Sequence, residues 1–359
     1  MSAQATAIND DGTIVGVRAD SGSEPYDFIY KNGVMRPLVG ASNIPRADCC
    51  TPTPAALSAT EKIAGGSGIF VALWDAPDAT PRVYDAGPAG TDAGLYVVGV
   101  NDRGDILASL SEHDGIQGHG TALLWRNGVR QNLGYLADTG VGHPSTYPRA
   151  WNSNGQIVGS SKVGLLVFTD RPPGEVFHPI IWDGGVMRDL GTLAPLPCPP
   201  NELNVTDCSF GEASGINSQG VVVGTSSAGS GGRAFVWEKG VMRDLGAYPG
   251  HYTRAIAIND RGQILGSVDE KTFLWDKGQT QIVTDTFTAM TTALGANGEV
   301  IGSTDAGGNV RHAFVWKDGH FTELGTGQPI ALNSRGDIIG VWYSRYGYQA
   351  ILWRKKSGT

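Results

Sequence analysis

The chain has few charged residues, few cysteines and no long hydrophobic run, and each shortage argues against a class of protein. Only 17% of its 359 residues are charged, which fits extensive sheet with little exposed helix. The net charge of −8 argues against a surface for nucleic acid or for an anionic membrane. No stretch of about 18 apolar residues occurs, so the sequence predicts no membrane span.

Motifs for metals and cofactors are also missing. The four cysteines (Cys49, Cys50, Cys198 and Cys208) do not stand at metal-site spacing with histidines, which argues against zinc. The sequence contains no glycine-rich phosphate loop, no serine elbow of the Gly-x-Ser-x-Gly kind and no His-Glu-x-x-His. We therefore expect neither a metal nor a cofactor. Cys198 and Cys208 flank one polar loop, where a disulfide would fit in an oxidising compartment.

What the chain does contain is a phrase that returns eight times. Its clearest copy reads Ala-Ile-Asn-Asp-Arg-Gly-Gln-Ile-Leu-Gly (residues 257–266) and is followed by Phe-Leu-Trp and a turn at Gly278. A unit of this length cannot bury its own apolar face, so the units must stack or close into a ring. Counted on the Asn position, the copies begin at Asn9, Ser58, Asn101, Asn152, Asn217, Asn259, Gly295 and Asn333.

The first half of each unit predicts a β-hairpin. Asn opening a type I turn, with Gly at its end, is the favoured turn chemistry, because the Asn side chain caps the turn and Gly accepts a positive φ. Two residues before the Asn position every copy has Ala or Gly, which predicts a crowded place where the innermost strands meet. The turn glycines are Gly12, Gly104, Gly155, Gly220, Gly262, Gly298 and Gly336. The small residues are Ala7, Ala56, Gly99, Ala150, Gly215, Ala257, Ala293 and Ala331.

The second half of each unit predicts another hairpin. Its first strand ends in an aromatic residue, and a short turn containing Gly leads to a strand such as residues 241–246. An aromatic residue at a fixed place is better explained as core between neighbouring sheets than as a stacking site. These aromatic residues are Tyr30, Trp74, Trp125, Trp182, Trp237, Trp275, Trp316 and Trp353.

Four short antiparallel strands per unit predict an all-β fold, a β-propeller of about eight four-stranded blades, in a single domain over residues 1–359. A parallel β-helix is disfavoured because its coils are shorter and lack paired hairpin turns. The eighth copy stops at Trp353-Arg354-Lys355-Lys356, before its fourth strand. Seven blades plus a partial one is therefore the alternative.

The segment from Arg311 to Trp316, the Ala-Ile-Asn-x-x-Gly-x-Ile-x-Gly phrases and the Met-Arg-Asp-Leu-Gly endings resemble the HAF repeat family of bacterial proteins. The resemblance covers nearly the whole chain. It implies a secreted or periplasmic repeat protein, and it carries over no catalytic residues because the shared motif is structural. The start Met1-Ser2-Ala3-Gln4 contains no signal peptide, so a cytoplasmic protein is the alternative.

The length of the chain varies outside the predicted hairpin turns. In a propeller these variable connections lie together on one face, where binding and catalytic residues usually lie. We therefore expect the functional site on that face. The between-blade connections include 40–55, 134–149, 191–213 and 247–255, and the within-blade connections include 18–27, 109–121, 160–179, 303–312 and 341–349.

Two of the between-blade connections contain the same three polar residue types. His can move a proton near neutral pH, Tyr can donate one, and Arg can hold a carboxylate or an oxyanion. We expect both sets at the mouth of the central channel, two blades apart. The structural alternative is that the arginines pair with loop acids while the other residues pack the rim. The first loop carries His143, Tyr147 and Arg149, and the second carries His251, Tyr252 and Arg254.

Two further places are candidates for ligand binding. Glu212 stands just before the first strand of the fifth copy and either presents a carboxylate to the channel or pairs with a neighbouring arginine. The most aromatic stretch contains Trp342, Tyr343, Arg345 and Tyr346. Aromatic residues between polar ones suit stacking on a carbohydrate or planar ligand, and packing at the edge of a blade explains them almost as well.

Three functions remain open from the sequence. The first is a propeller that binds a small organic or saccharide ligand on its elaborated face without turnover. The second is an enzyme of lyase, cyclase or isomerase type at the same mouth, with a histidine as general base, a tyrosine as acid and an arginine holding the substrate. The third is a protein-interaction platform, which rests on fold analogy only. We expect a monomer in each case, with no nucleic-acid or membrane partner.

Overall fold

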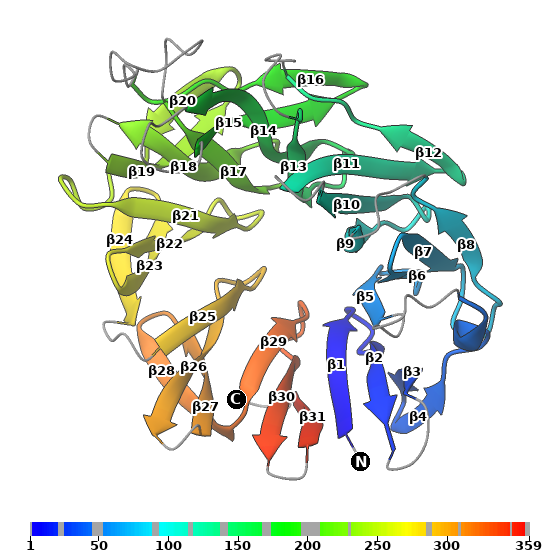
Figure 1. Cartoon of the computed structure of the whole chain (residues 1–359). Helices are drawn as coiled ribbons and strands as arrows, with labels where there is room; N and C mark the ends of the chain where they lie inside the picture. Colours follow the sequence, from blue (N-terminus) through cyan, green and yellow to red (C-terminus); the bar gives the residue numbers. More distant parts are fainter. Residues whose placement is uncertain are drawn as a thin grey trace. The chain divides into compact units, whose positions relative to one another are not determined.

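The described residues form an all-β structure. The computed structural model describes residues 2–20, 25–44, 53–87, 93–113, 118–136, 143–166, 174–194, 209–228, 231–284, 289–307, 310–344 and 347–355. They contain strands β1 to β31 and one short 3₁₀ helix, η1 (Ala41–Asn43). The strands form eight antiparallel sheets in this part of the chain, seven of four strands and one of three, one for each repeat (Figure 1). The protein is an eight-bladed β-propeller, as the repeat predicts.

The blades follow the chain in order, so each contains consecutive strands. Blade 1 comprises β1 (Ser2–Ile8), β2 (Ile14–Ala19), β3 (Tyr26–Lys31) and β4 (Val34–Pro37). Blade 2 comprises β5 (Thr53–Leu57), β6 (Ile63–Ser67), β7 (Phe70–Trp74) and β8 (Arg82–Asp85). Blade 3 comprises β9 (Gly94–Val100), β10 (Ile106–His113), β11 (Gly118–Arg126) and β12 (Val129–Asn132). Blade 4 comprises β13 (Thr146–Trp151), β14 (Ile157–Leu166), β15 (Gly174–Asp183) and β16 (Val186–Asp189).

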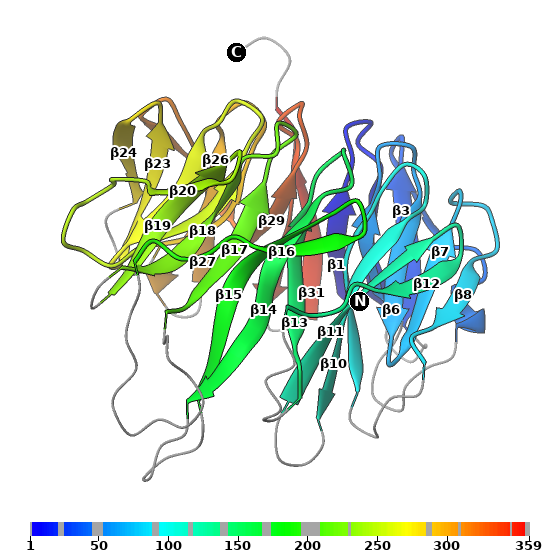
Figure 2. The same ribbon diagram turned by 90° about the horizontal axis from the view of Figure 1, so that it is seen from above.

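The second half of the chain repeats this order, and Figure 2 shows the strands of blades 4 and 5 lying side by side within each sheet. Blade 5 comprises β17 (Gly211–Ile216), β18 (Val222–Ala228), β19 (Gly231–Glu238) and β20 (Val241–Asp244). Blade 6 comprises β21 (Thr253–Ile258), β22 (Ile264–Val268), β23 (Lys271–Asp276) and β24 (Gln279–Thr284). Blade 7 comprises β25 (Ala289–Leu294), β26 (Val300–Gly307), β27 (Val310–Lys317) and β28 (His320–Thr326). Blade 8 comprises β29 (Gln328–Leu332), β30 (Ile338–Ser344) and β31 (Gly347–Trp353).

Two compact units make up the chain. Unit 1 comprises Met1–Leu110, Leu123–Gln131 and Thr286–Thr359, and unit 2 comprises Ser111–Ala122 and Asn132–Asp285. Blades 1, 2, 7 and 8 belong to unit 1, blades 4, 5 and 6 belong to unit 2, and blade 3 contributes to both. That residues 1–359 act as a single domain stays a prediction.

The Asn of the repeat closes the first hairpin of its blade, as the sequence predicts. In blade 5 the backbone oxygen of Asn217 accepts a hydrogen bond from Gly220 N at 3.0 Å. The Asn217 Oδ1 accepts from Gln219 N at 3.2 Å and from Val221 N at 2.9 Å. The seven turn glycines have φ values of 77° to 86°. In copy two, which lacks this Gly, Glu61 adopts the left-handed conformation instead, with φ 62°.

The same Asn also joins its blade to the next one, which the sequence does not predict. In four pairs of neighbouring blades among the described residues, the Asn side-chain Nδ2 donates to the backbone oxygen at the Asn position of the following blade. One repeated side chain therefore satisfies its own turn and links two sheets. The bonds are Asn9 to Ser58 (3.3 Å) and Asn333 to Asn9 (3.0 Å) in unit 1, and Asn152 to Asn217 (3.0 Å) and Asn217 to Asn259 (3.4 Å) in unit 2.

Blade 8 has three strands in the described chain, as the truncated eighth copy predicts. Strand β1 does not supply a fourth strand, because it pairs with β2 in its own blade. It lies beside β29, β30 and β31 instead (Figure 1), and Ser334 N donates to Asp10 Oδ1 at 2.8 Å. Blades 8 and 1 are thus held by face packing rather than by a shared sheet. The buried cluster between them comprises Ala5, Ile14, Phe28 and Ile339.

A β-bulge precedes the small residue in the first strand of most blades. In blade 5 the pairing of β17 with β18 shifts between Ala213 and Gly215, which leaves Ser214 as the extra residue. A Cβ atom on Gly215 would lie 3.4 Å from Ile258 N of the next blade, so the first strands of neighbouring blades come close to van der Waals contact here. In blade 4 the extra residue is Arg149. A bulge changes the direction of the side chain it carries, here that of Arg149.

Most of the repeated aromatic residues belong to the core, as the sequence predicts, and Tyr30, Trp237 and Trp275 are partly buried and pack against it. Trp74, Trp125, Trp182 and Trp316 are buried, and Trp74 Nε1 donates to Val39 O at 2.8 Å. Buried apolar residues of adjacent blades form shared clusters, so the core lies between neighbouring sheets rather than within one. This arrangement explains why a single repeat cannot fold by itself.

Some of the predicted within-blade connections are wrong. Much of 109–121, 160–179, 303–312 and 341–349 lies in the second and third strands of blades 3, 4, 7 and 8. In blade 4 the pairing of β14 with β15 continues outward to Leu166 and Gly174. Backbone hydrogen bonding stabilises these extensions beyond the apolar core, and an apolar pattern alone does not reveal that.

Copy seven replaces the Asn by Gly295, and the structure shows the reason. A Cβ atom at Gly295 would lie 2.8 Å from Leu332 Cδ1 and 2.9 Å from Glu299 Oε2. The Glu299 carboxylate, which is largely buried, accepts a hydrogen bond from Lys317 Nζ at 2.7 Å. Burial alone would raise the pKa of Glu299, but the hydrogen bond and the charge of Lys317 outweigh it and lower that pKa below its ordinary value.

The Glu299→Gln variant should therefore lose a pH-dependent part of its stability. A carboxyl whose pKa is lower in the folded state stabilises it above the unfolded pKa, and this contribution disappears as the pH falls through the folded pKa. We expect the variant to be less stable at pH 7 by on the order of 1 kcal/mol, with the difference shrinking below about pH 4. Urea unfolding at several pH values measures it. The exposed Glu270→Gln is the control, and a loss that does not change with pH would contradict the assignment.

Candidate functional site

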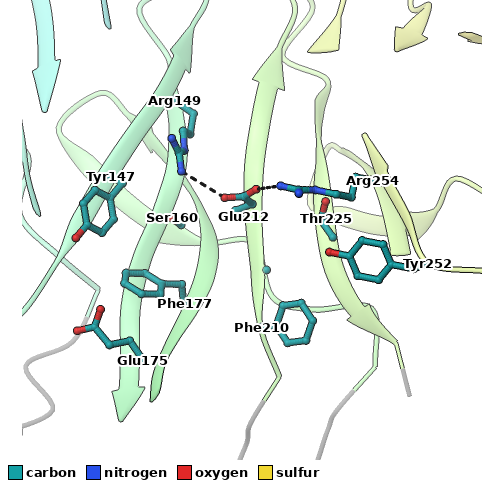
Figure 3. A pocket seen from close by; sticks show the side chains of 11 residues that line it. Tyr147, Arg149, Ser160, Glu175, Phe177, Phe210, Glu212, Thr225, Tyr252 and Arg254 are labelled. Carbon is teal, nitrogen blue, oxygen red and sulfur yellow. Dashed lines mark hydrogen bonds and ion pairs between the residues drawn. The ribbon is translucent and has the colours of Figure 1, made fainter. Parts of the chain in front are cut away.

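Parts of the two predicted loops meet at one pocket in unit 2. Its volume is about 440 Å³, within the range of small-molecule sites. Blades 4, 5 and 6 contribute its walls, with the first strand of each blade at its centre (Figure 3). The lining residues are Tyr147, Arg149, Ser160, Glu175, Phe177, Phe210, Gly211, Glu212, Thr225, Tyr252 and Arg254.

The repeat explains why these side chains converge. Tyr147, Glu212 and Arg254 each stand five residues before the Asn position of their own copy. Consecutive blades therefore present them at the same level of their first strands, β13, β17 and β21. Arg149 is the bulged residue of β13, and its side chain reaches toward Glu212 of the next blade (Figure 3). Glu212 lies in the strand itself, not just before it as the sequence predicts.

The centre of the pocket is an Arg–Glu–Arg cluster. Arg254 Nη2 donates to Glu212 Oε1 at 3.0 Å, and Arg149 Nη2 lies 3.6 Å from Glu212 Oε2. About half of each arginine side chain is exposed, so much of both guanidinium groups faces the pocket and solvent. One carboxylate thus holds two arginines in place without using most of their donors.

A second carboxylate of the pocket is already neutralised. Glu175 Oε1 lies 2.9 Å from Lys162 Nζ, and only 1% of the Lys162 side chain is exposed. The same ammonium donates to His143 O at 3.1 Å. Because this buried lysine compensates Glu175, the two arginines and Glu212 leave the pocket with one positive charge in excess. An anionic group is the complementary partner.

Aromatic rings flank the charged cluster. The rings of Tyr147 and Phe177 are tilted, with centroids 5.7 Å apart, while Phe210 and Tyr252 are exposed at the opposite side (Figure 3). Burial raises the pKa of the Tyr147 phenol, and the nearby charge of Glu175 raises it further. Tyr147 therefore keeps its proton at neutral pH and is available as a hydrogen-bond donor.

Two glycines make room for the tyrosines. A Cβ atom on Gly120 would fall inside the Tyr147 ring, and one on Gly232 would lie 2.5 Å from Tyr252 Cε2. Both glycines stand five residues before the Trp of their copy, where blade 4 has Phe177. The neighbouring blade thus leaves a space that the next tyrosine fills.

The prediction that the two histidines join this site is wrong. His143 lies in the turn before β13 and stacks on His119, with ring centroids 4.6 Å apart, beside a separate cavity of about 190 Å³. His251 Nδ1 lies 3.0 Å from Asp269 Oδ2, and both side chains are mostly exposed. Both histidines stand before the strands, β13 and β21, that carry the arginines of the pocket.

The aromatic candidates near the end of the chain lie elsewhere. Trp342 and Tyr343 belong to β30 in unit 1, not to a loop, and they line another pocket. Arg345 and Tyr346 lie outside the described residues.

Sequence analysis missed Glu175, Phe177, Phe210 and Lys162. A signal for two of them was present, because Glu175 and Phe177 alternate with the buried Val176 as residues on one face of a strand do. That signal was masked because residues 160–179 were assigned to a connection. Lys162 gave no signal, since its burial depends on Glu175 and on the backbone of the loop before β13.

Among the described residues, no group of three or more His, Cys, Asp or Glu side chains could hold a metal ion. None of the helices described is long and apolar enough to cross a membrane.

Comparisons with known proteins show the fold. Neither the protein-family models nor the curated proteins match this chain. The β-propeller domain of the Trilobed protease from Pyrococcus furiosus is similar in structure, with 11% identity, 90% of this chain and 98% of that chain covered, and a TM-score of 0.52. A prolyl endopeptidase is also similar, with 13% identity, 83% of this chain and 47% of that chain covered, and a TM-score of 0.51. The acylaminoacyl peptidase of Pyrococcus horikoshii is similar as well, with 11% identity, 94% of this chain and 57% of that chain covered, and a TM-score of 0.51.

These likenesses show the fold alone. The chain spans about half the length of the two peptidases. At such low identity, no peptidase residue or substrate is transferred to this protein.

Proposed function

We propose that this protein binds a small organic carboxylate in the pocket of blades 4, 5 and 6, without turnover. The observation that supports the proposal is the Arg–Glu–Arg cluster between aromatic rings, with Arg254 held at 3.0 Å from Glu212. Arginine offers planar pairs of donors that match a carboxylate, and charge-assisted hydrogen bonds are about twice as strong as neutral ones. The rings would hold the apolar part of the ligand.

The size and charge of the pocket agree with such a ligand. A volume of about 440 Å³ accommodates a single ring with a short carboxylate arm. The excess positive charge disfavours cations and gives no particular advantage to a neutral molecule. Glu212 fixes both guanidinium groups before the ligand arrives, which reduces the entropy lost on binding.

The enzyme alternative is weaker for a specific reason. It assigned the general base to His143 or His251, and neither lines the pocket. The carboxylates of Glu212 and Glu175 are each paired with cations, so neither replaces the histidines as an unpaired base. Binding is therefore the function that the geometry supports better. Membership of the HAF repeat family and export from the cell stay predictions.

Isothermal titration calorimetry with benzoate, 3-phenylpropionate and the neutral benzamide tests the proposal. At least one of the two acids should bind, and benzamide should bind at least about tenfold more weakly. Arg149→Gln and Arg254→Gln should each weaken binding of the acid by about tenfold, since each removes a charged donor. The exposed Arg243→Gln on β20 is the matched control.

Two outcomes would contradict the proposal. One is equal binding of benzamide and benzoate, which would show that the charge is not recognised. The other is unchanged affinity in both pocket variants, which would place the ligand elsewhere.

A further inference from the structure

A second pocket lies between blades 7 and 8, within unit 1. Its volume is about 240 Å³, and Asp305, Arg311, Gln328, Trp342 and Tyr343 contribute to its lining. Gln328 stands five residues before Asn333, the same repeat position as Glu212 and Arg254 of the first pocket. Blades 7 and 8 thus form a crevice at the same repeat position as the first pocket, but different side chains line it.

Arg311 carries an unsatisfied donor in this pocket. Its Nη1 atom is buried and has no hydrogen-bond partner among the described residues. A buried polar atom without a partner is costly, so such an atom calls for an explanation. The pocket is therefore lined by a guanidinium whose donors are not all used by the described residues.

The other polar groups argue against an anion as that ligand. Asp305 is the cross-strand partner of Arg311 in the pairing of β26 with β27. Its Oδ1 accepts a hydrogen bond from Gly307 N at 2.8 Å, and a carboxylate retains further acceptor sites. The charges of Asp305 and Arg311 offset each other, and the Gln328 amide adds both a donor and an acceptor. Groups that both donate and accept fit hydroxyl groups better than a carboxylate or a phosphate.

Aromatic side chains lie beside these polar groups. Trp342 is 38% exposed and Tyr343 is 50% exposed, although both are large apolar residues. The Tyr343 ring contacts Tyr348 edge to face, with centroids 5.2 Å apart, which restrains its position. An aromatic surface next to mixed donors and acceptors matches a pyranose ring, which has an apolar C–H face and a rim of hydroxyl groups.

We propose that the crevice between blades 7 and 8 is a binding site for a neutral saccharide. Arg311 and Gln328 donate to its hydroxyl oxygens, Asp305 accepts from its hydroxyl groups, and an aromatic side chain of β30 covers its C–H face. The volume of the pocket fits one pyranose ring, so the site recognises a terminal or single sugar residue. This proposal does not depend on the carboxylate pocket of unit 2.

Saturation-transfer NMR on the full chain tests the site, with glucose, galactose, mannose and N-acetylglucosamine as probes and glucuronate as the anionic comparison. At least one neutral sugar should bind, and glucuronate should bind no better than glucose. Arg311→Gln, Asp305→Asn and Trp342→Ala should each weaken the sugar that binds best by about tenfold, the loss expected for one anchoring contact. Tyr96→Ala, which removes an exposed aromatic residue of unit 1 outside the pocket, should leave its affinity unchanged.

The controls separate this proposal from the first one. Arg254→Gln should not change sugar binding, and benzoate should not compete with the sugar. The proposal is overturned if none of the four sugars binds, if glucuronate binds better than glucose, or if the three pocket variants bind as the parent does. Circular dichroism of each variant checks that it folds. A misfolded Trp342→Ala would be replaced by Trp342→Phe, which keeps an aromatic ring and should retain binding.

Discussion

Replacing Gly224 by alanine is expected to destabilise the protein by about 3 kcal/mol, the upper end for an added methyl in a packed interior. A Cβ atom at Gly224 would overlap Glu212 O of the neighbouring strand and would lie 2.8 Å from Phe235 Cε1 and 2.9 Å from Ala213 Cα. A side chain could turn away, but a backbone oxygen cannot move without moving β17. The variant should therefore also displace Glu212 and weaken the carboxylate pocket.

Urea unfolding at neutral pH measures the loss of stability, and calorimetry with benzoate measures the loss of affinity. Gly231→Ala in the same blade is the matched control, because a Cβ atom there would have no heavy atom within 4 Å. The control should remain within about 0.5 kcal/mol of the parent, as substitutions at open surface sites do. Equal stability of the two variants would refute the close-approach explanation.

The same close approach recurs along the chain and explains the last glycine of the repeated phrase. At Gly16, Gly159, Gly266, Gly302 and Gly340 an added Cβ would also overlap or crowd the backbone oxygen five residues before the Asn position. That oxygen belongs to the residue whose side chain can line a pocket, such as Tyr147 or Arg254. The scaffold glycine and the variable site residue are therefore in direct contact.

Replacing Asn333 by alanine is expected to cost about 3 kcal/mol, since it leaves three buried or part-buried polar groups without the Asn333 side chain as partner. Asn333 is 6% exposed, and its Oδ1 accepts from Arg335 N at 3.1 Å and from Asp337 N at 2.9 Å. Its Nδ2 donates to Asn9 O at 3.0 Å, which joins blade 8 to blade 1. The variant loses the side-chain hydrogen bonds within the turn and the hydrogen bond that links the two blades.

Chemical unfolding of three variants separates these contributions. Asn333→Asp keeps the Oδ1 acceptor but places a second oxygen against Asn9 O and Asp337 Oδ2, so it should lose at least as much stability as the alanine variant. Asn297→Ala is the control, because its bond to Ser334 O, at 3.1 Å, is exposed and is worth about 1 kcal/mol. A loss in Asn333→Ala no larger than in the control would rule out the inter-blade role.

Most of the fold could be predicted from local sequence signals. The Asn-x-x-Gly turns, the paired hairpins and the Trp core follow from the conformational and apolar preferences of the residues themselves. The link from Asn333 to Asn9 could not be predicted, because the Asn already has a sufficient role in its own turn. The outward extension of β14 and β15 was missed because backbone pairing continues where the apolar pattern ends.

The site was predicted in part. One pocket is lined by Tyr147, Arg149, Tyr252 and Arg254 from the two loops that the sequence singled out, and the pairing of an arginine with Glu212 was stated as the structural alternative. His143 and His251 stand before β13 and β21 and do not line the pocket, whereas Tyr252, which also stands before its strand, does. The functional roles of all these residues stay predictions until the binding experiments are made.

The sequence by itself determined the repeat, its hairpins, the propeller class and the loops from which the site residues come. These properties depend on residues within one unit, where turn preference and alternation act over a few positions. Tertiary structure alone decided that Glu212 lies between Arg149 and Arg254, that Lys162 neutralises Glu175, and that blade 8 packs against blade 1 without sharing a strand. Those contacts depend on how one blade packs on another, which brings together side chains that are distant in the chain, so no pattern within a single repeat encodes them.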